Sequence, residues 1–328
     1  MSTKMSMAKA LNSGLRRSME GNEKVLMMGE DVGRLGGVFR VTDGLQKDFG
    51  EGRVLDTPLA ESGIVGTAVG LTYRGFRPVV EIQFDGFVYP AYDQIVSQVA
   101  RLHFRSLGAV KMPIVIRIPF GGGIGAVEHH SDSPEAQFAL TAGLKVVSCS
   151  NPNDAYWMIQ QAIDSDDPVV FMEPKRRYWE NGEVDLESAP DSLWSSRVVR
   201  PGRDATLITY GPMVTTCLQS AEAALADGLD LEVIDLRTLS PLELAPVYES
   251  VRRTGHAVVV HEAQRTLGLG AEIAARITEE CFYHLEAPVQ RVTGYDMPYP
   301  PSRVEDEFLP GLDRIIDAVE RAREIGAN

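Results

Sequence analysis

Two kinds of apolar pattern alternate along the first half of this 328-residue chain, and this alternation is the feature that most constrains its fold. Short apolar runs typical of buried strands are separated by stretches with helical periodicity. The alternation predicts a parallel sheet covered by helices on both faces, with ligands at the carboxyl ends of the strands. The predicted strands are 24–28, 54–55, 78–84, 113–119, 144–148 and 168–172, and the clearest helices are 5–20, 61–74, 91–104 and 154–164.

A second, smaller set of strands and helices follows a polar stretch rich in Gly and Pro, which we interpret as an interdomain linker. The chain is longer than one hydrophobic core usually supports, so two domains are expected. We predict an α/β protein of two doubly wound domains, 1–178 and 204–328, joined by a linker at 179–203. The later strands are predicted at 205–210, 231–236 and 257–260, and the later helices at 214–226, 242–254, 271–281 and from 311 onward.

Composition excludes several classes of function. A formal net charge of −14 argues against nucleic acid as a partner, because phosphate binding needs concentrated Lys and Arg. No apolar run reaches the ~18 residues that a membrane span requires, and the N-terminus lacks an apolar signal core. We therefore expect no membrane partner and a cytoplasmic location. Cys149, Cys217 and Cys281 show no metal or disulfide spacing and are interpreted as core thiols.

Glu61 is an unusual lone charge. It follows a short apolar strand and Pro58, it begins a helix rich in Gly and Ala, and no Lys or Arg follows until Arg74. A carboxylate in such a place would be poorly solvated unless a ligand neutralises it. The alternative is that Glu61 only favours the dipole of its helix from the first turn.

A glycine-rich loop, Gly121-Gly122-Gly123-Ile124-Gly125, follows the predicted strand 113–119. It can be a mobile loop that lets a ligand approach the backbone or, less readily, a phosphate cradle, because its spacing matches no phosphate-binding motif. His129 and His130 follow it. Adjacent histidines in an extended segment would point in opposite directions, which disfavours zinc, but this position suits proton transfer near neutral pH. Ser133 and Pro134 are predicted to start the next helix.

Aromatic residues fill the segment 81–90, where a strand passes into a helix. They can be ordinary core residues, or they can offer a flat face to a heteroaromatic ligand at the strand end.

Several ordered motifs together resemble the beta subunits of the thiamine-diphosphate-dependent 2-oxo acid dehydrogenases. The resemblance covers nearly the whole chain and implies a transketolase-like pyrimidine-binding domain followed by a transketolase-type C-terminal domain. The motifs are Gly29-Glu30-Asp31-Val32-Gly33, Asp56-Thr57-Pro58 with Glu61, the segments 81–94 and 129–135, Glu173-Pro174-Lys175, the segment 235–241, and His261-Glu262.

The resemblance implies roles for particular residues. Glu61 would hydrogen-bond the aminopyrimidine ring of thiamine diphosphate and promote its imino tautomer, while the cofactor itself carries the carbanion chemistry. Phe87 would pack against the pyrimidine, with Gln83 in the same segment. His130 would assist acyl transfer to a lipoyl group, with His129 beside it.

The resemblance also implies partners. The family forms α2β2 heterotetramers with the cofactor at the α/β interface, and the beta chain docks on the subunit-binding domain of a lipoyl acyltransferase core. The family's Mg²⁺ motif begins with GDG, which this chain lacks, so an alpha subunit should hold the Mg²⁺ and the diphosphate. Potassium would bind through the backbone carbonyls of Ile114, Val115, Ala162, Ser165 and Asp167.

The segments 81–87 and 129–136 resemble the branched-chain (2-oxoisovalerate) members more than the pyruvate members. Pyruvate and acetoin dehydrogenases are the alternatives for the substrate. Two other interpretations remain open, a mainly structural docking subunit and a self-sufficient transketolase-like enzyme. Because five loop residues carry a high ordering cost, we also expect the loop 121–132 to order only with cofactor and alpha subunit present.

Overall fold

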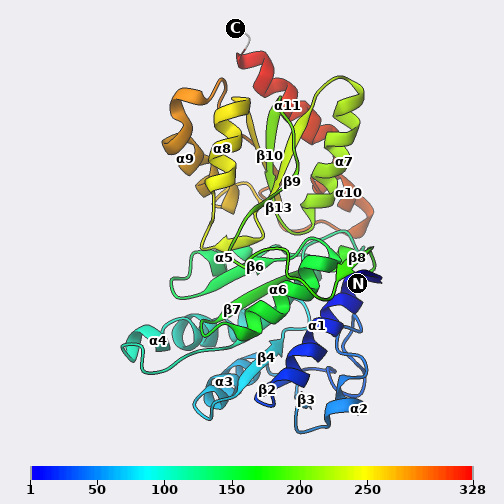
Figure 1. Ribbon diagram of the computed structural model, residues 1–328, viewed down its shortest axis with the longest axis vertical. Helices are drawn as coiled ribbons and strands as arrows, with labels where there is room; N and C mark the ends of the chain where they lie inside the picture. Colours follow the sequence, from blue (N-terminus) through cyan, green and yellow to red (C-terminus); the bar gives the residue numbers. More distant parts are fainter. Residues whose placement is uncertain (1, 327–328) are drawn as a thin grey trace. The chain divides into compact units, whose positions relative to one another are not determined.

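The computed structural model describes residues 2–326 (Figure 1). The chain divides into two compact units. The first unit comprises residues 1–120 and 137–193, and the second comprises residues 121–136 and 194–328. The glycine-rich loop and both histidines of the sequence analysis therefore belong to the second unit, although the chain on either side of them belongs to the first.

The first unit is built on a parallel sheet. Its strands lie in the order β6-β7-β5-β4-β2-β3, and every neighbouring pair is parallel, as the alternating pattern predicts. Apolar β-branched side chains fill these strands because both faces of a parallel sheet are buried. The strands are β2 (Val25–Gly29), β3 (Val54–Asp56), β4 (Arg77–Glu81), β5 (Val115–Phe120), β6 (Lys145–Ser148) and β7 (Val169–Pro174).

Helices of the first unit begin at local signals that the sequence carries. Ser6 caps α1 (Met7–Gly21) by accepting from the Lys9 N–H, and Asn151 caps α6 (Pro152–Asp164) by accepting from the Asp154 N–H. These two helices run side by side (Figure 1). The other helical segments are α2 (Leu45–Phe49), α3 (Glu61–Thr72), η1 (Asp85–Ala91), η2 (Gln94–Val99), α4 (Leu102–Arg105) and η4 (Lys175–Arg177).

Two predicted elements are wrong in detail. The single helix expected at 91–104 is instead η1, a 3₁₀ helix that ends at Ala91, then η2, a π-helix, then the short α4. Pro90 lies inside η1, ahead of the predicted helix, so it does not account for the π-helix at Gln94–Val99. The strand expected at 78–84 ends at Glu81, so Gln83 and Phe84 lie outside the sheet.

The segment 179–203, predicted as a linker, contains two strands. In the first unit β8 (Asn181–Asp185) pairs antiparallel with β1 (Ser2–Ser6), a strand that the sequence pattern did not indicate. In the second unit β9 (Arg197–Arg200) pairs antiparallel with β11 (Leu231–Asp235). The domain boundaries at 178 and 203 stay a prediction.

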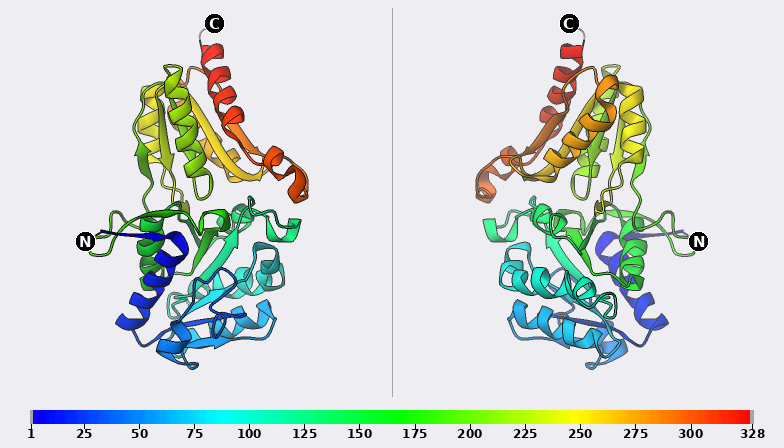
Figure 2. Two further views of the ribbon diagram at one scale, coloured as in Figure 1. Left: turned by 90° about the vertical axis from the view of Figure 1, so that its right-hand side faces the viewer. Right: turned by 90° about the vertical axis from the view of Figure 1, so that its left-hand side faces the viewer.

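The second unit has a five-stranded sheet in the order β14-β13-β10-β11-β9. Helices α7 and α11 pack together on this sheet, and α8 and α9 pack together on it as a second pair (Figures 1 and 2). The apolar core includes Leu207, Val233, Val258 and Val319. The remaining elements are η3 (Glu128–His130), α5 (Glu135–Ala139), β10 (Ala205–Thr209), α7 (Met213–Ala226), β12 (Thr238–Ser240), α8 (Ala245–Thr254), β13 (Ala257–Gln264), α9 (Leu269–Cys281), η5 (Phe282–His284), β14 (Gln290–Gly294), η6 (Ser302–Val304), α10 (Glu305–Phe308) and α11 (Leu312–Gly326).

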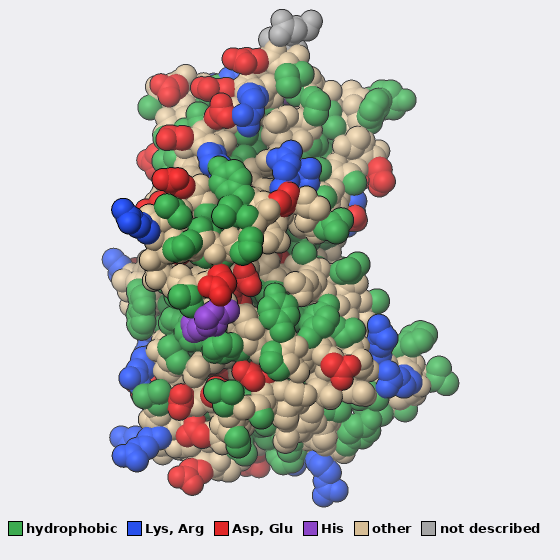
Figure 3. All heavy atoms as spheres, turned by 180° about the vertical axis from the view of Figure 1, so that it is seen from behind, with side chains coloured by type: hydrophobic (Ala, Val, Ile, Leu, Met, Phe, Trp, Pro, Cys, Tyr) green, Lys and Arg blue, Asp and Glu red, His purple; other side chains and the backbone are tan. Residues whose placement is uncertain are grey.

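Within residues 2–326, no helix has the length and apolarity to cross a membrane. On the face shown in Figure 3, acidic and basic side chains are interspersed rather than segregated. All three cysteines are buried and free, which confirms their interpretation as core thiols.

A buried ion network ties three strands of the first unit together. Arg117 on β5 is fully buried and pairs with Glu173 on β7, at 2.6 Å for Nε to Oε1 and 2.8 Å for Nη2 to Oε2, and also with Glu81 on β4. The Tyr178 hydroxyl donates to Glu173 Oε2 at 2.5 Å. Burial and the Glu173 charge raise the pKa of Tyr178 well above its usual range, so Tyr178 remains a donor.

We predict that Arg117→Ala will destabilise the chain by about 3–5 kcal/mol, because it leaves two buried carboxylates without their cation. Urea unfolding of the isolated chain, followed by circular dichroism, measures this change. Arg321→Ala is the matched control. It breaks a pair of half-exposed side chains with Asp317 and should change stability by less than about 0.5 kcal/mol. Equal effects of the two substitutions would contradict the prediction.

Candidate active site

Glu61 is the first residue of α3, directly after the turn at Pro58. Its side chain is only 7% exposed, although the residues just before it are exposed. Ala60, at the N-cap, provides no side-chain hydrogen bond to the helix. The carboxylate is therefore buried at the N-terminal, positive end of the dipole of α3.

Glu30, which the sequence analysis did not select, is a second buried carboxylate beside Glu61. It follows β2 directly and is 8% exposed. Burial, the charge of Glu61 and the charge of Asp31 together raise the pKa of Glu30. The signal in the sequence that could have identified Glu30 was its position at the carboxyl end of a central strand, where the ligands of parallel sheets bind.

Gln83 and Phe87 lie on the connection after β4, at the same edge of the sheet. Gln83 Nε2 donates to Asp31 Oδ2 at 3.3 Å, which links this connection to the residues after β2. Phe87 is half-buried in η1, which packs against α3, and its ring meets Phe84 edge-on with centroids 5.9 Å apart. The first unit thus brings together three of the predicted residues, Glu61, Gln83 and Phe87.

A fully buried ion pair anchors this connection. Lys175, just after β7, bonds through Nζ to Asp85, the first residue of η1. The Lys175 ammonium also lies 5.6 Å from the centre of the Phe84 ring. Both contacts fix the start of η1, and so the place of Phe87 two residues later.

The two histidines lie in the second unit. The expectation of an extended segment is wrong, because residues Glu128–His130 form a 3₁₀ turn and not a pleated strand. The two rings therefore do not diverge but meet edge-on, with centroids 4.4 Å apart. The next helix, α5, begins at Glu135, so Pro134 precedes the helix and is not its first residue.

Polar atoms without partners make the first unit fit an aminopyrimidine. Glu30 Oε1 and Thr57 Oγ1 are buried and find no hydrogen-bond partner within residues 2–326. A heteroaromatic ring with both donors and acceptors would satisfy such atoms, and Phe87 offers it an apolar face. A metal fits less well. The described part of the chain holds no group of three or more His, Cys, Asp or Glu side chains arranged for a metal ion.

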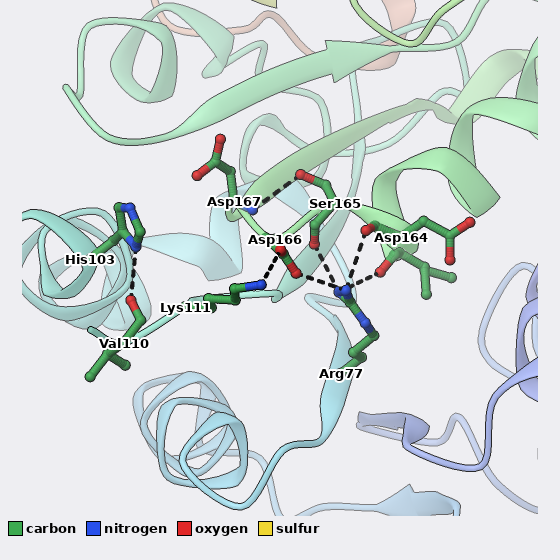
Figure 4. Close-up of polar contacts among 9 residues, drawn as sticks. Arg77, His103, Val110, Lys111, Asp164, Ser165, Asp166 and Asp167 are labelled. Carbon is green, nitrogen blue, oxygen red and sulfur yellow. Dashed lines mark hydrogen bonds and ion pairs between the residues drawn. The ribbon is translucent and has the colours of Figure 1, made fainter. Parts of the chain in front are cut away.

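One of the carbonyls suggested for potassium, that of Ser165, already binds a cation of the protein itself (Figure 4). Arg77 Nη1 donates to the carbonyls of Ser165, at 2.9 Å, and Ile163, at 3.1 Å. Its Nη2 reaches the Asp164 carbonyl and, at 2.9 Å, Asp166 Oδ1. Lys111 Nζ pairs with Asp166 Oδ2 at 2.6 Å, and this hydrogen bond is the largest cause of the lowered pKa of Asp166. Potassium here stays a prediction, and the charge of Arg77 at the Ser165 carbonyl would oppose it.

Comparisons with known proteins agree with this α/β fold. Residues 3–180 match the family described as "Transketolase, pyrimidine binding domain", and residues 195–315 match "Transketolase, C-terminal domain". A solved structure described as a split gene transketolase, inactive beta4 tetramer, superposes with a TM-score of 0.79 at 19% identity, covering 98% of this chain and 99% of the other. At that identity the likeness shows the fold alone.

Three curated relatives are much more similar. The chain is 58% identical to a pyruvate dehydrogenase E1 component subunit beta of Leifsonia xyli, covering 96% of this chain and 94% of the relative. It is 54% identical to a 3-methyl-2-oxobutanoate dehydrogenase subunit beta of Mycobacterium tuberculosis, with coverages of 97% and 91%. It is 46% identical to a 2-oxoisovalerate dehydrogenase subunit beta of Pseudomonas aeruginosa, with coverages of 98% and 96%.

The two matched domains define a transketolase-type protein with a thiamine pyrimidine-binding domain. Within that class, the chain belongs to the beta subunits of the thiamine-diphosphate-dependent 2-oxo acid dehydrogenases. The relatives differ in the 2-oxo acid that their names specify, so the family is established and the substrate is not.

The raised pKa of Glu30 generates a prediction about pH. A carboxyl whose pKa rises on folding binds its proton more tightly in the folded state, so its contribution to stability is lost as pH rises through the folded pKa. Glu30→Gln stays neutral and should therefore raise the melting temperature at pH 8. The gain should shrink as the pH falls towards the ordinary carboxyl range.

Melting curves of the wild-type chain and the variant between pH 5 and pH 8 measure this difference. Glu23→Gln, at an exposed carboxylate of the same unit, is the control and should show no such trend. A gain from Glu30→Gln that is the same at every pH would refute the electrostatic explanation.

Proposed function

We propose that this chain is the beta subunit of a branched-chain 2-oxo acid dehydrogenase, which decarboxylates its substrate oxidatively and transfers the acyl group to a lipoyl arm. The observation that carries the proposal is the buried carboxylate of Glu61 at the start of α3, beside Glu30 at the carboxyl edge of the sheet. Two buried acids of this kind, close to an aromatic side chain, suit a ligand that exchanges protons.

Thiamine diphosphate, when bound, supplies the nucleophilic carbon and the electron sink for decarboxylation. Glu61 would hold a proton at a ring nitrogen of the aminopyrimidine. Its burial strengthens that hydrogen bond because water does not compete for the carboxylate. Phe87 would pack against the ring, and Gln83, held by Asp31, would orient the polar edge of the site.

His130 would donate or accept a proton during acyl transfer, with His129 as its neighbour. The edge-on contact of the two rings supports a shared task, because it places both imidazoles on one short turn. Imidazole is the side chain whose charge changes most readily near neutral pH.

An alpha subunit would complete the site in an α2β2 heterotetramer. That partner would hold the Mg²⁺ and the diphosphate; among the described residues of this chain, no three His, Cys, Asp or Glu side chains are grouped for a metal ion. Large apolar side chains at Leu59, Phe104 and Leu107 are more than three quarters exposed, at 78%, 84% and 94%. Surfaces of this kind are usually covered by another chain.

The choice of substrate rests on the segments 81–87 and 129–136, which resemble branched-chain members. Pyruvate is the alternative, favoured by the name of the 58% identical relative, and acetoin is a further one. A docking subunit without catalytic residues would leave the burial of Glu61 and Glu30 unexplained. A self-sufficient transketolase-like enzyme would need a metal site within this chain.

We predict that decarboxylation, measured with thiamine diphosphate and Mg²⁺, will require both this chain and a co-expressed alpha subunit. The rate should be higher with 2-oxoisovalerate than with pyruvate. Glu61→Ala in the same pair should lower kcat by at least about a hundredfold, as expected for a positioned proton-transfer group.

Each outcome of that assay separates the alternatives. Activity of the chain alone would support the self-sufficient enzyme, and an unaffected Glu61→Ala pair would support a structural subunit. A higher rate with pyruvate would replace the branched-chain assignment. Glu23→Ala, at an exposed position, is the control for a general effect of losing a carboxylate.

We also propose that the second unit docks on the basic subunit-binding domain of a lipoyl acyltransferase core. A groove of about 1000 Å³ runs along α9, with small side chains such as Ala271, Ala274 and Ala275 in its lining. Phe282, which also lines it, is 62% exposed, and its charged lining consists of two acids, Glu279 and Glu286, and one base, Arg291. An apolar groove with acidic side chains fits a small basic domain.

We predict that Glu279→Lys and Glu286→Lys will each weaken binding of that subunit-binding domain by about tenfold, because charge reversal turns attraction into repulsion. Calorimetric titration of the heterotetramer at two salt concentrations measures the affinity. Glu222→Lys, on the exposed face of α7, is the matched charge reversal outside the groove. If all three variants bind equally well, the groove is not the docking site.

A further inference from the structure

The N–H groups of the glycine-rich loop point at two buried carboxylates of the second unit. The Gly122 N–H donates to Glu262 Oε2 at 3.0 Å. The Gly123 N–H donates to Glu305 Oε1 at 2.8 Å, and the Gly125 N–H donates to Glu305 Oε2 at 3.0 Å. Three backbone donors of one short loop are thus satisfied by Glu262, on β13, and Glu305, at the start of α10.

These hydrogen bonds are of a strong kind. Glu262 is 4% exposed and Glu305 is 6% exposed, so water hardly competes for either carboxylate. A hydrogen bond to a buried charge is stronger than one between neutral groups. The buried carboxylate in turn needs these donors, because they replace the water that solvated it. Glu305 thus accepts hydrogen bonds from the loop backbone at two points, one on each side of Ile124.

Tyr299 orients Glu305. Its hydroxyl donates to Glu305 Oε1 at 2.6 Å and accepts from the Gly123 N–H at 3.3 Å. Burial and the hydrogen bond to Glu305 raise the pKa of Tyr299 far above its usual range, so the hydroxyl keeps its proton. The Glu305 carboxylate is therefore held in place by the Tyr299 hydroxyl as well as by the N–H groups of the loop.

This contact explains why the loop consists of glycine. A Cβ on Gly121 would lie 2.7 Å from Glu262 Oε2, and a Cβ on Gly122 would lie 1.9 Å from the Tyr299 hydroxyl oxygen. At Gly121 and Gly122 the backbone thus approaches Glu262 and Tyr299 too closely for a side chain, while Gly123 and Gly125 have positive φ angles that favour glycine. A phosphate cradle is disfavoured, because the N–H groups that would bind phosphate already donate to carboxylates of the same charge sign.

The two histidines follow the glycine-rich loop within the same segment of the second unit. The Gly121 N–H donates to the Asp132 carbonyl at 2.9 Å, which closes the segment between them. At its far end, the Tyr210 hydroxyl donates to Glu135 Oε1 at 2.6 Å, and Glu135 is fully buried. His129 and His130 thus lie on a segment that the second unit holds near both ends.

We propose that Glu305, with Glu262, is a positioning residue for His130. It fixes the backbone of the loop 121–125 and thereby the place of the histidine turn. The inference rests on the proposed role of His130 in acyl transfer, but the contact between carboxylate and loop stands on the hydrogen bonds alone.

The test compares Glu305→Ala, Glu305→Gln and the control Glu307→Ala in the heterotetramer reconstituted with an alpha subunit. Glu307 lies on the same short helix and is exposed, and no hydrogen bond joins its side chain to the loop within residues 2–326. Amide hydrogen exchange of peptides covering residues 121–132 reports the loop directly. The ratio of acyl transfer to a lipoyl domain over decarboxylation with an artificial oxidant reports the histidines.

Glu305→Ala should speed exchange in the loop by about tenfold or more, because two charge-assisted hydrogen bonds are lost. It should also lower the ratio of transfer to decarboxylation by about tenfold. Glu305→Gln should lie between wild type and alanine, since an amide offers one acceptor oxygen instead of two. The control Glu307→Ala should match wild type in both measurements.

Unchanged exchange in Glu305→Ala would overturn the inference. So would an equal loss of both activities together with a lowered melting temperature, which indicates a merely structural residue. His130→Ala separates this inference from the proposed function. If Glu305→Ala loosens the loop while His130→Ala leaves the transfer ratio unchanged, Glu305 holds the loop as inferred and the proposed role of His130 fails.

Discussion

The position of Arg117 is the constraint on which the first unit depends. This guanidinium joins Glu81 on β4 to Glu173 on β7 from the strand between them, near the ends where all three strands leave the sheet. Gln83 follows Glu81 by two residues, and Lys175 follows Glu173 by two. A buried cation with two carboxylates tolerates little displacement, because each partner loses solvation that only the others replace. The connection that carries Phe87 therefore starts from a fixed point.

Buried carboxylates serve two different purposes in this chain. Glu81 and Glu173 meet a cation, and Glu305 meets backbone N–H groups, so these acids stabilise structure. Burial, together with the charges of Glu61 and Asp31, raises the pKa of Glu30. Placing a buried carboxyl next to these acids costs stability, as is expected where a site must receive a ligand. Burial raises the pKa of Glu81 as well, but there the charge of Arg117 opposes the rise, whereas the charges beside Glu30 add to it.

Much of the first unit followed from local pattern. The parallel sheet and the start of α3 at Glu61 were predicted, because each depends on residues close in sequence. The helices α1 and α6 were predicted without their caps at Ser6 and Asn151. The strand β1 was not predicted, since its partner β8 lies far along the chain. The broken helix after Pro90 was missed as well, because helical periodicity does not distinguish an α-helix from a short 3₁₀ or π segment.

The sequence by itself indicated the α/β class through the spacing of its strands and the family through the resemblance of several ordered motifs. It also singled out Glu61 as a candidate site residue, because a lone acid in an apolar context is a local property. Only the tertiary structure placed Glu30 beside Glu61 and turned the two histidine rings towards each other. It also showed that Glu262 and Glu305 approach the backbone of the glycine-rich loop, which helps to explain its glycines. These contacts join residues far apart along the chain, and no local pattern encodes which distant carboxylate will neighbour a given N–H group.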